Sequence, residues 1–245
     1  MKIIFLLCTL LSARTISAQT IIDRDREISQ MVNEISKDSL RSYITTLVAF
    51  GTRNTLSAQT NPKRGIGAAR NWVLKKFNDF AKNADGRLSA FIDTVTIQPN
   101  GKRINRPILL GNVMATLKGT DLKDKRILII SGHLDNMRTN VMDSTGDAPG
   151  ADDDGSGTAA VLECARIMSK HSFPATIIFV AVSGEEQGLF GSTYMAEKAK
   201  KENWNIEAVL NNDIMGSNNS NETDIINNTK VRVFSDGIPH YDTEE

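Results

Sequence analysis

The chain has 245 residues, of which 40% are hydrophobic and 24% are charged, as in an ordinary globular protein. Its 29 basic and 29 acidic residues balance, so the charge favours neither nucleic acid nor an anionic membrane surface, and we expect no nucleic-acid partner. The length suffices for one α/β domain with a sizeable core.

The first 18 residues have the pattern of a secretory signal peptide. Lys2 precedes an apolar run over residues 3–11, and the small residues Ser17 and Ala18 close the segment. The run is too short to span a bilayer, which needs about 20 apolar residues. We therefore predict cleavage after Ala18, a secreted or periplasmic location without stable membrane insertion, and one domain over residues 19–245. A buried N-terminal element is the alternative.

Three helices are predicted after the signal segment. Apolar residues recur at helical spacing within residues 28–35, 40–48 and 69–80. The segment 51–64 is polar and is expected to be a loop. These helices carry no chemistry of their own, and we expect them to cover a sheet.

The remainder alternates predicted strands and helices. Near-continuous apolar strands between helices favour an α/β fold with a largely parallel sheet covered on both faces. Cys164 falls on the apolar stripe of one helix, where we expect a small buried hydrophobe. Cys8 would leave with the signal peptide, so no internal disulfide is expected. The predicted strands are residues 112–117, 126–130, 175–182 and 208–210, and the predicted helices are 156–170 and 191–200.

Four polar clusters stand out along this part of the chain. Residues 131–135 read Ser-Gly-His-Leu-Asp, 149–157 read Pro-Gly-Ala-Asp-Asp-Asp-Gly-Ser-Gly, 183–188 read Ser-Gly-Glu-Glu-Gln-Gly, and 211–213 read Asn-Asn-Asp. Three of them directly follow predicted strands, and the acidic cluster lies in the loop after the first. Because ligands bind beyond the carboxyl ends of such strands, we expect all four clusters at one rim.

The chemistry of these clusters points to a metal. Carboxylates gathered on one rim repel one another and lose hydration unless a cation compensates. None of the four clusters contains Lys or Arg. Imidazole with carboxylate oxygens suits Zn²⁺, and one carboxylate can bridge two ions.

Two pairs of residues suggest further roles. A metal-bound histidine usually donates its other ring N–H to a carboxylate, so we place Asp135 in the catalytic set as the residue that orients His133. Glu185 and Glu186 are adjacent and point different ways, so one can bind metal while the other acts as a base. Taken singly, the clusters could be capped turns, a Ca²⁺ loop or surface glutamates. Their common placement favours a site.

At these residues the chain resembles the secreted dizinc aminopeptidases, which are related to glutaminyl cyclase, glutamate carboxypeptidase and the transferrin-receptor ectodomain. The resemblance covers residues 105–216, and residues 51–57 also look like the family's N-terminal region. It implies a three-layer α/β fold with a mixed, mostly parallel sheet, two Zn²⁺ cofactors and peptide substrates.

Carried over by position, the resemblance also implies individual roles. His133 and Asp213 would hold one zinc, and Glu186 would help to hold the other. Asp153 would bridge both ions, and Glu185 would be the catalytic general base. The flanking Asp152 and Asp154 are weaker candidates for metal ligands.

The chain departs from the family in one respect. The family's second zinc takes a final histidine from well beyond the Asn-Asp motif, and besides His133 only His171 and His240 occur here. His171 precedes the strand 175–182, so we expect it on the surface at the opposite end of the sheet. Nothing after His240 can form a final strand and helix. We therefore expect a catalytic domain that is incomplete at its C-terminus and lacks this second-site ligand.

The function that this resemblance implies is that of a zinc-dependent exopeptidase that removes N-terminal residues from peptides through a metal-bridging water. A related carboxypeptidase, with Arg138 as its candidate cation, and a glutaminyl cyclase-like enzyme remain alternatives. So do a non-catalytic fragment or binding module and a Ca²⁺-binding domain that uses the Asn-rich stretch 218–228.

Overall fold

The structure is a computed structural model, and it describes residues 25–218, 226–227, 229 and 233–234. The predicted signal segment, His240 and most of the Asn-rich stretch lie outside these residues. The chain divides into two units, Met1–Asn33 and Glu34–Glu245. In the first unit, α1 (Arg26–Asn33) is capped by the Asp25 carboxylate, which accepts the N–H of Glu27 at 2.7 Å.

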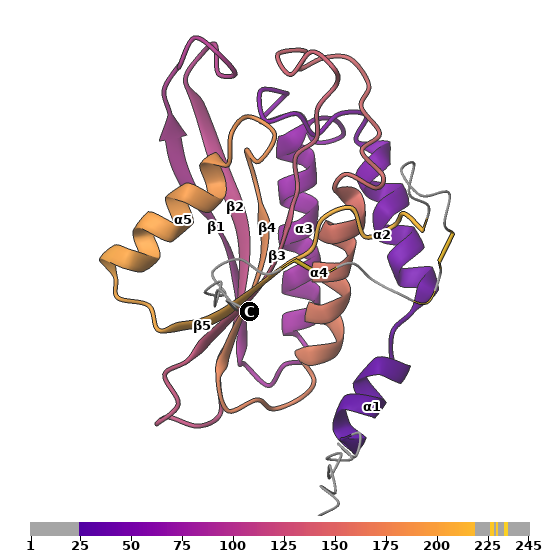
Figure 1. Ribbon diagram of the computed structural model, residues 1–245, viewed down its shortest axis with the longest axis vertical. Coiled ribbons are helices and arrows are strands. Elements are labelled where there is room, and N and C mark those ends of the chain that lie inside the picture. The colour runs from indigo at the N-terminus through magenta and orange to yellow at the C-terminus, as the bar shows by residue number, and fades with distance from the viewer. Residues whose placement is uncertain (1–24, 219–225, 228, 230–232, 235–245) are drawn as a thin grey trace, which may run out of the picture. The chain divides into compact units, whose positions relative to one another are not determined.

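The second unit is built on a sheet with the strand order β1-β2-β4-β3-β5 (Figure 1). β3 pairs in parallel with β4 and β5, whereas β2 pairs antiparallel with β1 and β4. The sheet is therefore mixed, as predicted, and the carboxyl ends of β3, β4 and β5 share one edge. The strands are β1 (Leu88–Ile97), β2 (Ile108–Leu117), β3 (Ile127–His133), β4 (Thr176–Val182) and β5 (Ile206–Asn211).

Helices cover both faces of this sheet, which confirms the three-layer α/β prediction. α2 (Lys37–Ala49), α3 (Ile66–Ala81) and α4 (Gly155–Met168) lie on one face, and α5 (Phe190–Lys201) lies on the other (Figure 1). Among the described helices, none has the length and apolar character needed to cross a membrane.

The sheet separates two apolar cores. Phe179 of β4 packs with Phe77 and Leu162 in the core under α3 and α4. Its neighbour Val180 points the other way and packs with Met195 of α5. Because side chains alternate across a strand and both faces are covered, β4 reads as a continuous apolar run, which is why the sequence predicts it well. Cys164, which we expected to be buried, is a free thiol that is partly buried against the first core.

Of the two edge strands, β5 was predicted as residues 208–210, and β1 was not predicted. β1 is not among the predicted strands, because it pairs only with β2 and carries polar residues such as Asp93 and Thr94 among its apolar ones. At the opposite edge, β5 pairs with β3, and Val209 and Leu210 are 55% and 58% exposed. β5 is therefore the most exposed strand near the predicted rim.

The prediction that His171 lies on the surface is wrong. Its side chain is 12% exposed, and its Nε2 atom lies 3.6 Å from Oε1 of Glu34. Arg87 donates to its main-chain oxygen at 2.8 Å. The chain folds back against these groups directly after α4, so His171 is covered, although it remains at the amino end of β4 and away from the rim.

Candidate metal centre

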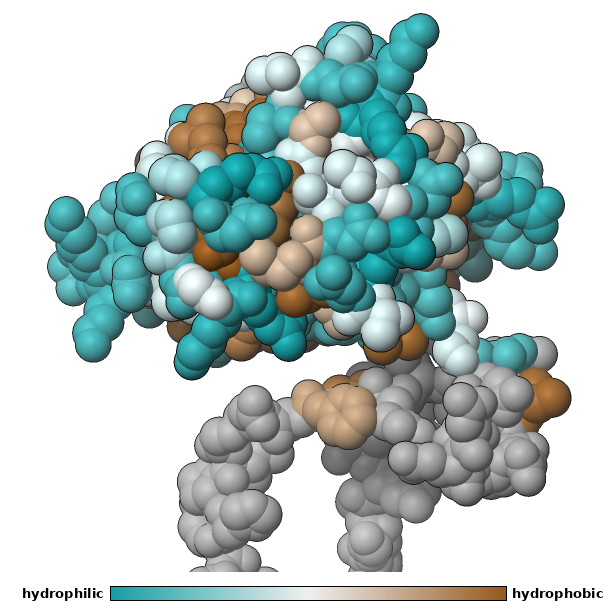
Figure 2. Space-filling view, turned by 90° about the horizontal axis from the view of Figure 1, so that it is seen from above, coloured by the Kyte–Doolittle hydropathy of each residue, from teal (hydrophilic) through white to brown (hydrophobic). Residues whose placement is uncertain are grey.

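The four polar clusters meet at the carboxyl edge of the sheet. His133 is the last residue of β3, and Glu185 and Glu186 lie in the turn after β4. Asp213 follows β5, and Asp153 lies in the turn that enters α4. The loops that join β1 to β2 and β3 to α4 rise at the top of Figure 1, and Figure 2 views this side, where hydrophilic residues cover much of the surface.

The imidazole of His133 faces two carboxylates. Its Nε2 atom lies 3.0 Å from Oδ1 of Asp153 and 3.9 Å from Oδ1 of Asp213. One ligand atom from each of these three residues lies within 4.8 Å of the others. The imidazole is 5% exposed, whereas the Asp153 and Asp213 side chains are 52% and 42% exposed, so the group opens toward solvent.

Asp135 makes a different contact from the one expected. Nδ1 of His133 lies 3.0 Å from the main-chain oxygen of Asp135 and 3.9 Å from its carboxylate. The carboxylate is fully buried and accepts hydrogen bonds from the N–H groups of Glu185 and Glu186 and from the Thr55 hydroxyl, all at 3.1 Å. Asp135 thus orients the histidine through its backbone and the glutamate turn through its side chain. Burial raises the pKa of its carboxyl group.

The turn after β4 presents two half-buried glutamates. Burial raises the pKa of Glu185, and burial together with the charge of Asp153 raises the pKa of Glu186 to about 7. Glu186 lies outside the three-residue group around His133, so the structure does not join all four expected ligands in one cluster. Arg103, from the loop between β1 and β2, donates to the main-chain oxygen of Glu186.

The aspartates beside Asp153 use their carboxylates within the protein. Asp154 caps α4 and accepts the N–H groups of Gly157 and His133, both at 2.8 Å, while burial raises its pKa to about 7. Asp152 accepts the N–H of Gly216 at 2.8 Å. Asp153 is thus the member of the acidic triplet whose carboxylate faces Nε2 of His133.

The turn that carries Asp213 is tied to β3. The main-chain N–H of Asn212 donates to the main-chain oxygen of Ser131 at 2.8 Å, and the Ser131 hydroxyl donates to Asn211 at 2.8 Å. A Cβ at Gly157 would lie 2.3 Å from the main-chain oxygen of Asn212, so only glycine permits this close approach.

This donor set fits a divalent metal. Several carboxylates lie around one imidazole, and burial raises the pKa values of Asp154 and Glu186, with smaller increases from the neighbouring carboxylates. A bound cation would offset the cost of burying these negative charges. Nitrogen and carboxylate oxygen ligands suit Zn²⁺.

Comparison with known proteins agrees with this geometry. The sequence profile of peptidase family M28 matches residues 112–237. The chain belongs to peptidase family M28.

This M28 chain is 43% identical to a probable zinc metalloprotease of Leptosphaeria maculans over 219 residues, which are 89% of this chain and 50% of that protein. It is 44% identical to one of Pyricularia oryzae over 213 residues, 87% of this chain and 42% of that protein. The chain spans about half the length of the curated relatives it matches.

Solved structures share the fold of this M28 chain. The LapA aminopeptidase of Legionella pneumophila superposes with a TM-score of 0.62 at 25% identity, covering 81% of this chain and 48% of that one. A glutaminyl cyclase of Porphyromonas gingivalis gives a TM-score of 0.59 at 23% identity, covering 75% and 62%. These similarities confirm the α/β fold and the resemblance found in the sequence.

Sequence reasoning missed several residues that support the M28 centre from below. Arg53, Thr55 and Asn136 are all buried beneath it. The sequence predicts the segment that contains Arg53 and Thr55 as a polar loop that resembles the family's N-terminal region. The likeness of residues 51–57 to the family was the available signal that polar side chains of this segment are buried.

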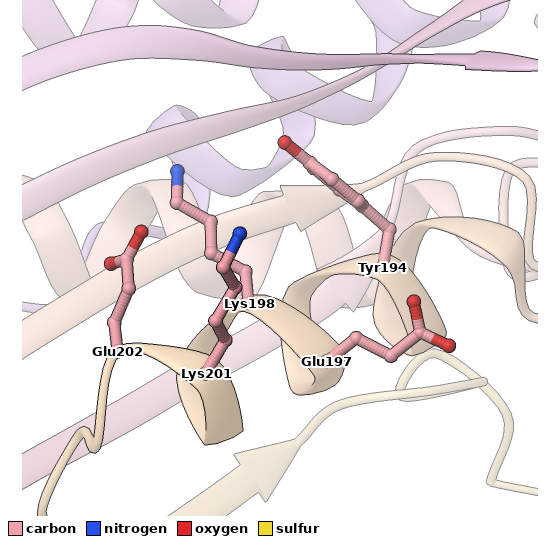
Figure 3. Close-up of a pocket in the computed structure, with 5 residues that line it drawn as sticks. All are labelled: Tyr194, Glu197, Lys198, Lys201 and Glu202. Atoms are coloured by element: carbon pink, nitrogen blue, oxygen red, sulfur yellow. The ribbon is translucent and has the colours of Figure 1, made fainter.

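Two other features do not belong to the centre. Arg138 pairs with Asp143 at 2.7 Å in an exposed loop, as a solvated arginine does, and this gives no support to a carboxylate-binding role. A pocket along α5 (Figure 3) is lined by charges of both signs, and its Tyr194 and Lys198 bind Asp93 of β1 at 3.3 and 2.9 Å. These contacts attach α5 to the sheet.

Proposed function

We propose that this M28 chain acts as a zinc-dependent aminopeptidase, which hydrolyses N-terminal residues from peptides. The observation that carries the proposal is the convergence of His133, Asp153 and Asp213 within 4.8 Å, beside the glutamate turn after β4. The family membership and the 25% identity to an aminopeptidase structure support it. The signal-peptide pattern of residues 1–18 supports a secreted or periplasmic location.

The proposed cofactors are two zinc ions. His133 and Asp213 would hold one ion, Glu186 would help to hold the other, and Asp153 would lie between them. Zinc would lower the pKa of a bound water toward neutrality and polarise the scissile carbonyl. The electrostatic interaction between Asp153 and Glu186 supports this division, because a cation between two such carboxylates would relieve their repulsion.

Glu185 is the proposed general base. Its backbone is held by Asp135 at 3.1 Å, so the carboxylate extends from a fixed turn. Burial raises its pKa, which makes it a better acceptor for the proton of the attacking water. The same carboxyl group would then deliver this proton to the leaving amine.

A combined metal and activity assay tests the proposal. Glu185→Gln should keep its zinc and lose about 10²- to 10⁴-fold in kcat, as expected for removal of a general base. His133→Ala should bind less zinc. Glu197→Gln, on α5, is the control and should behave like the wild type. Full turnover by Glu185→Gln, or a wild-type chain that binds no zinc, would refute the proposal.

The substrate assay separates the related activities. A peptide with a free N-terminus should be shortened from that end, and the same peptide with an acetylated N-terminus should resist. Shortening from the C-terminus would indicate a carboxypeptidase. Cyclisation of an N-terminal glutamine without chain shortening would indicate a glutaminyl cyclase.

A further inference from the structure

Arg53 is a fully buried cation beneath the candidate metal centre. It lies in the segment between α2 and α3, and it is 1% exposed. Its guanidinium donates four hydrogen bonds, all to main-chain oxygens. The acceptors are Leu134 at 2.8 Å, Leu47 at 3.1 Å, Pro149 at 3.0 Å and Gly150 at 2.8 Å.

These acceptors belong to three segments, and two of the three carry residues of the centre. Leu134 lies between His133 and Asp135, while Pro149 and Gly150 begin the turn that carries Asp153. One guanidinium therefore holds the end of β3 and the acidic turn at a set separation, and it also holds the end of α2.

Asn136 extends the same arrangement. Its Oδ1 atom accepts the main-chain N–H of Arg53 at 2.9 Å, and its Nδ2 atom donates to the main-chain oxygen of Ala148 at 2.7 Å. Arg53 and the Asn136 amide thus bond to both ends of the long connection between β3 and α4. The shape of the acidic turn is set from below.

The charge of Arg53 also matters at this position. Burial lowers its pKa to about 10, against the opposing effect of Asp135, Asp154 and Asp153, so it stays protonated at neutral pH. A positive charge within the protein lies under three carboxylates whose mutual repulsion would otherwise push the turns apart.

We propose that Arg53 is a positioning residue that assembles the metal centre before any metal binds, by joining the β3 end to the acidic turn and offsetting their negative charge. This inference rests on the proposed zinc site. Arginine suits the role because its planar, forked donors reach several carbonyls at once, whereas the single ammonium of lysine would leave some of these buried carbonyls without a donor.

Variants of two buried arginines provide the test. Arg53→Lys keeps the charge but loses the fork, and Arg53→Met loses both. Arg70 in α3 is the matched control, because it is 8% exposed. It donates to the main-chain oxygen of Leu109 at 2.9 Å and to the Gln59 side chain at 2.7 Å. Zinc dissociation constants are measured by competition with a chromophoric chelator, and folding is followed by circular dichroism.

Arg53→Lys should bind zinc about 10- to 100-fold more weakly, as is typical when a residue supporting metal ligands is changed, and Arg53→Met should bind it more weakly still. Arg70→Lys should bind zinc like the wild type. A folded Arg53→Lys variant with wild-type zinc affinity would overturn the inference, while the zinc site itself would stand.

Amide hydrogen exchange on the wild-type chain supplies a measurement that needs no variant. After treatment with EDTA, the amides of Gly155 and Gly157 should remain protected, because they bond to the main-chain oxygen of Gly150 at 3.0 Å and to the Asp154 carboxylate at 2.8 Å. If these amides exchange fast and are protected only after zinc is added, the acidic turn is not assembled before metal binds. This result would overturn the inference even if no Arg53 variant folds. A wild-type chain that binds no zinc would instead refute the proposed function.

Discussion

The two sides of the candidate metal centre are held in different ways. On the side of β3 and β4, His133 and Asp135 are 5% and 0% exposed and bond to several buried segments. On the side of β5, Asp213 is 42% exposed and follows a strand with exposed apolar side chains. Buried hydrogen bonds cannot be replaced by water, so the first side sets the geometry, and the second contributes a carboxylate whose position depends on it.

A substitution at the contact between the two sides should have a large effect on stability. A Cβ at position 157 would lie 2.3 Å from the main-chain oxygen of Asn212 and 2.5 Å from the Asp154 carboxylate, so Gly157→Ala must push the sides apart. We expect the free energy of unfolding to fall by about 1–3 kcal/mol in urea titrations. Ala160→Ser, in the same helix, should remain close to the wild type. Unchanged stability in Gly157→Ala would show that the sides can separate without cost.

Asp135→Asn should weaken the buried side alone. An amide has one oxygen, so the N–H of Glu185 or of Glu186 would lose its acceptor, at a cost of about 1–3 kcal/mol in stability. Because the glutamate turn would then loosen, kcat for peptide hydrolysis should also fall.

Asp93→Asn provides the matched comparison for that variant. Asp93 is a buried carboxylate that binds Tyr194 and Lys198, away from the centre. It should lose stability but keep its activity. If both variants lost activity equally, Asp135 would have no special part in orienting the turn.

Asp213→Asn should separate stability from metal binding. The side chain is 42% exposed, so we expect the stability of the metal-free chain to change by no more than about 0.5 kcal/mol, while zinc affinity falls. Asp147→Asn, at an exposed carboxylate paired with Arg64, should leave both unchanged. A large loss of stability in metal-free Asp213→Asn would show that the Asp213 side chain helps to hold the fold, which contradicts the view that the β5 side only follows the other.

Val209→Thr should have the smallest effect. Val209 of β5 is 55% exposed, so the free energy of unfolding of the variant should stay within about 0.5 kcal/mol of the wild type in thermal or urea unfolding. Val180→Thr on β4 buries a hydroxyl at a position with 0% exposure and should cost about 1–3 kcal/mol. Equal losses would mean that β5 is covered in solution.

The sequence predicted the parts of the fold whose pattern is local. The runs that become β3 and β4 are apolar throughout because both faces of the sheet are covered, and the polar clusters after them could be placed at one rim. β1 was missed because its partly exposed face mixes polar with apolar residues. His171 was misplaced because the cover over it comes from Glu34 and Arg87, which are distant in sequence.

The sequence by itself determined the chemistry that is present: an imidazole and several carboxylates at strand ends, in an order that matches the M28 family. Only the tertiary structure decided how each group is used. It directed Asp154 to the cap of α4, the Asp135 carboxylate to the glutamate turn, and Arg53 to the carbonyls beneath both. The physical reason is that a buried polar group must find partners wherever the packed chain brings them, and those partners are set by long-range contacts that no local pattern records.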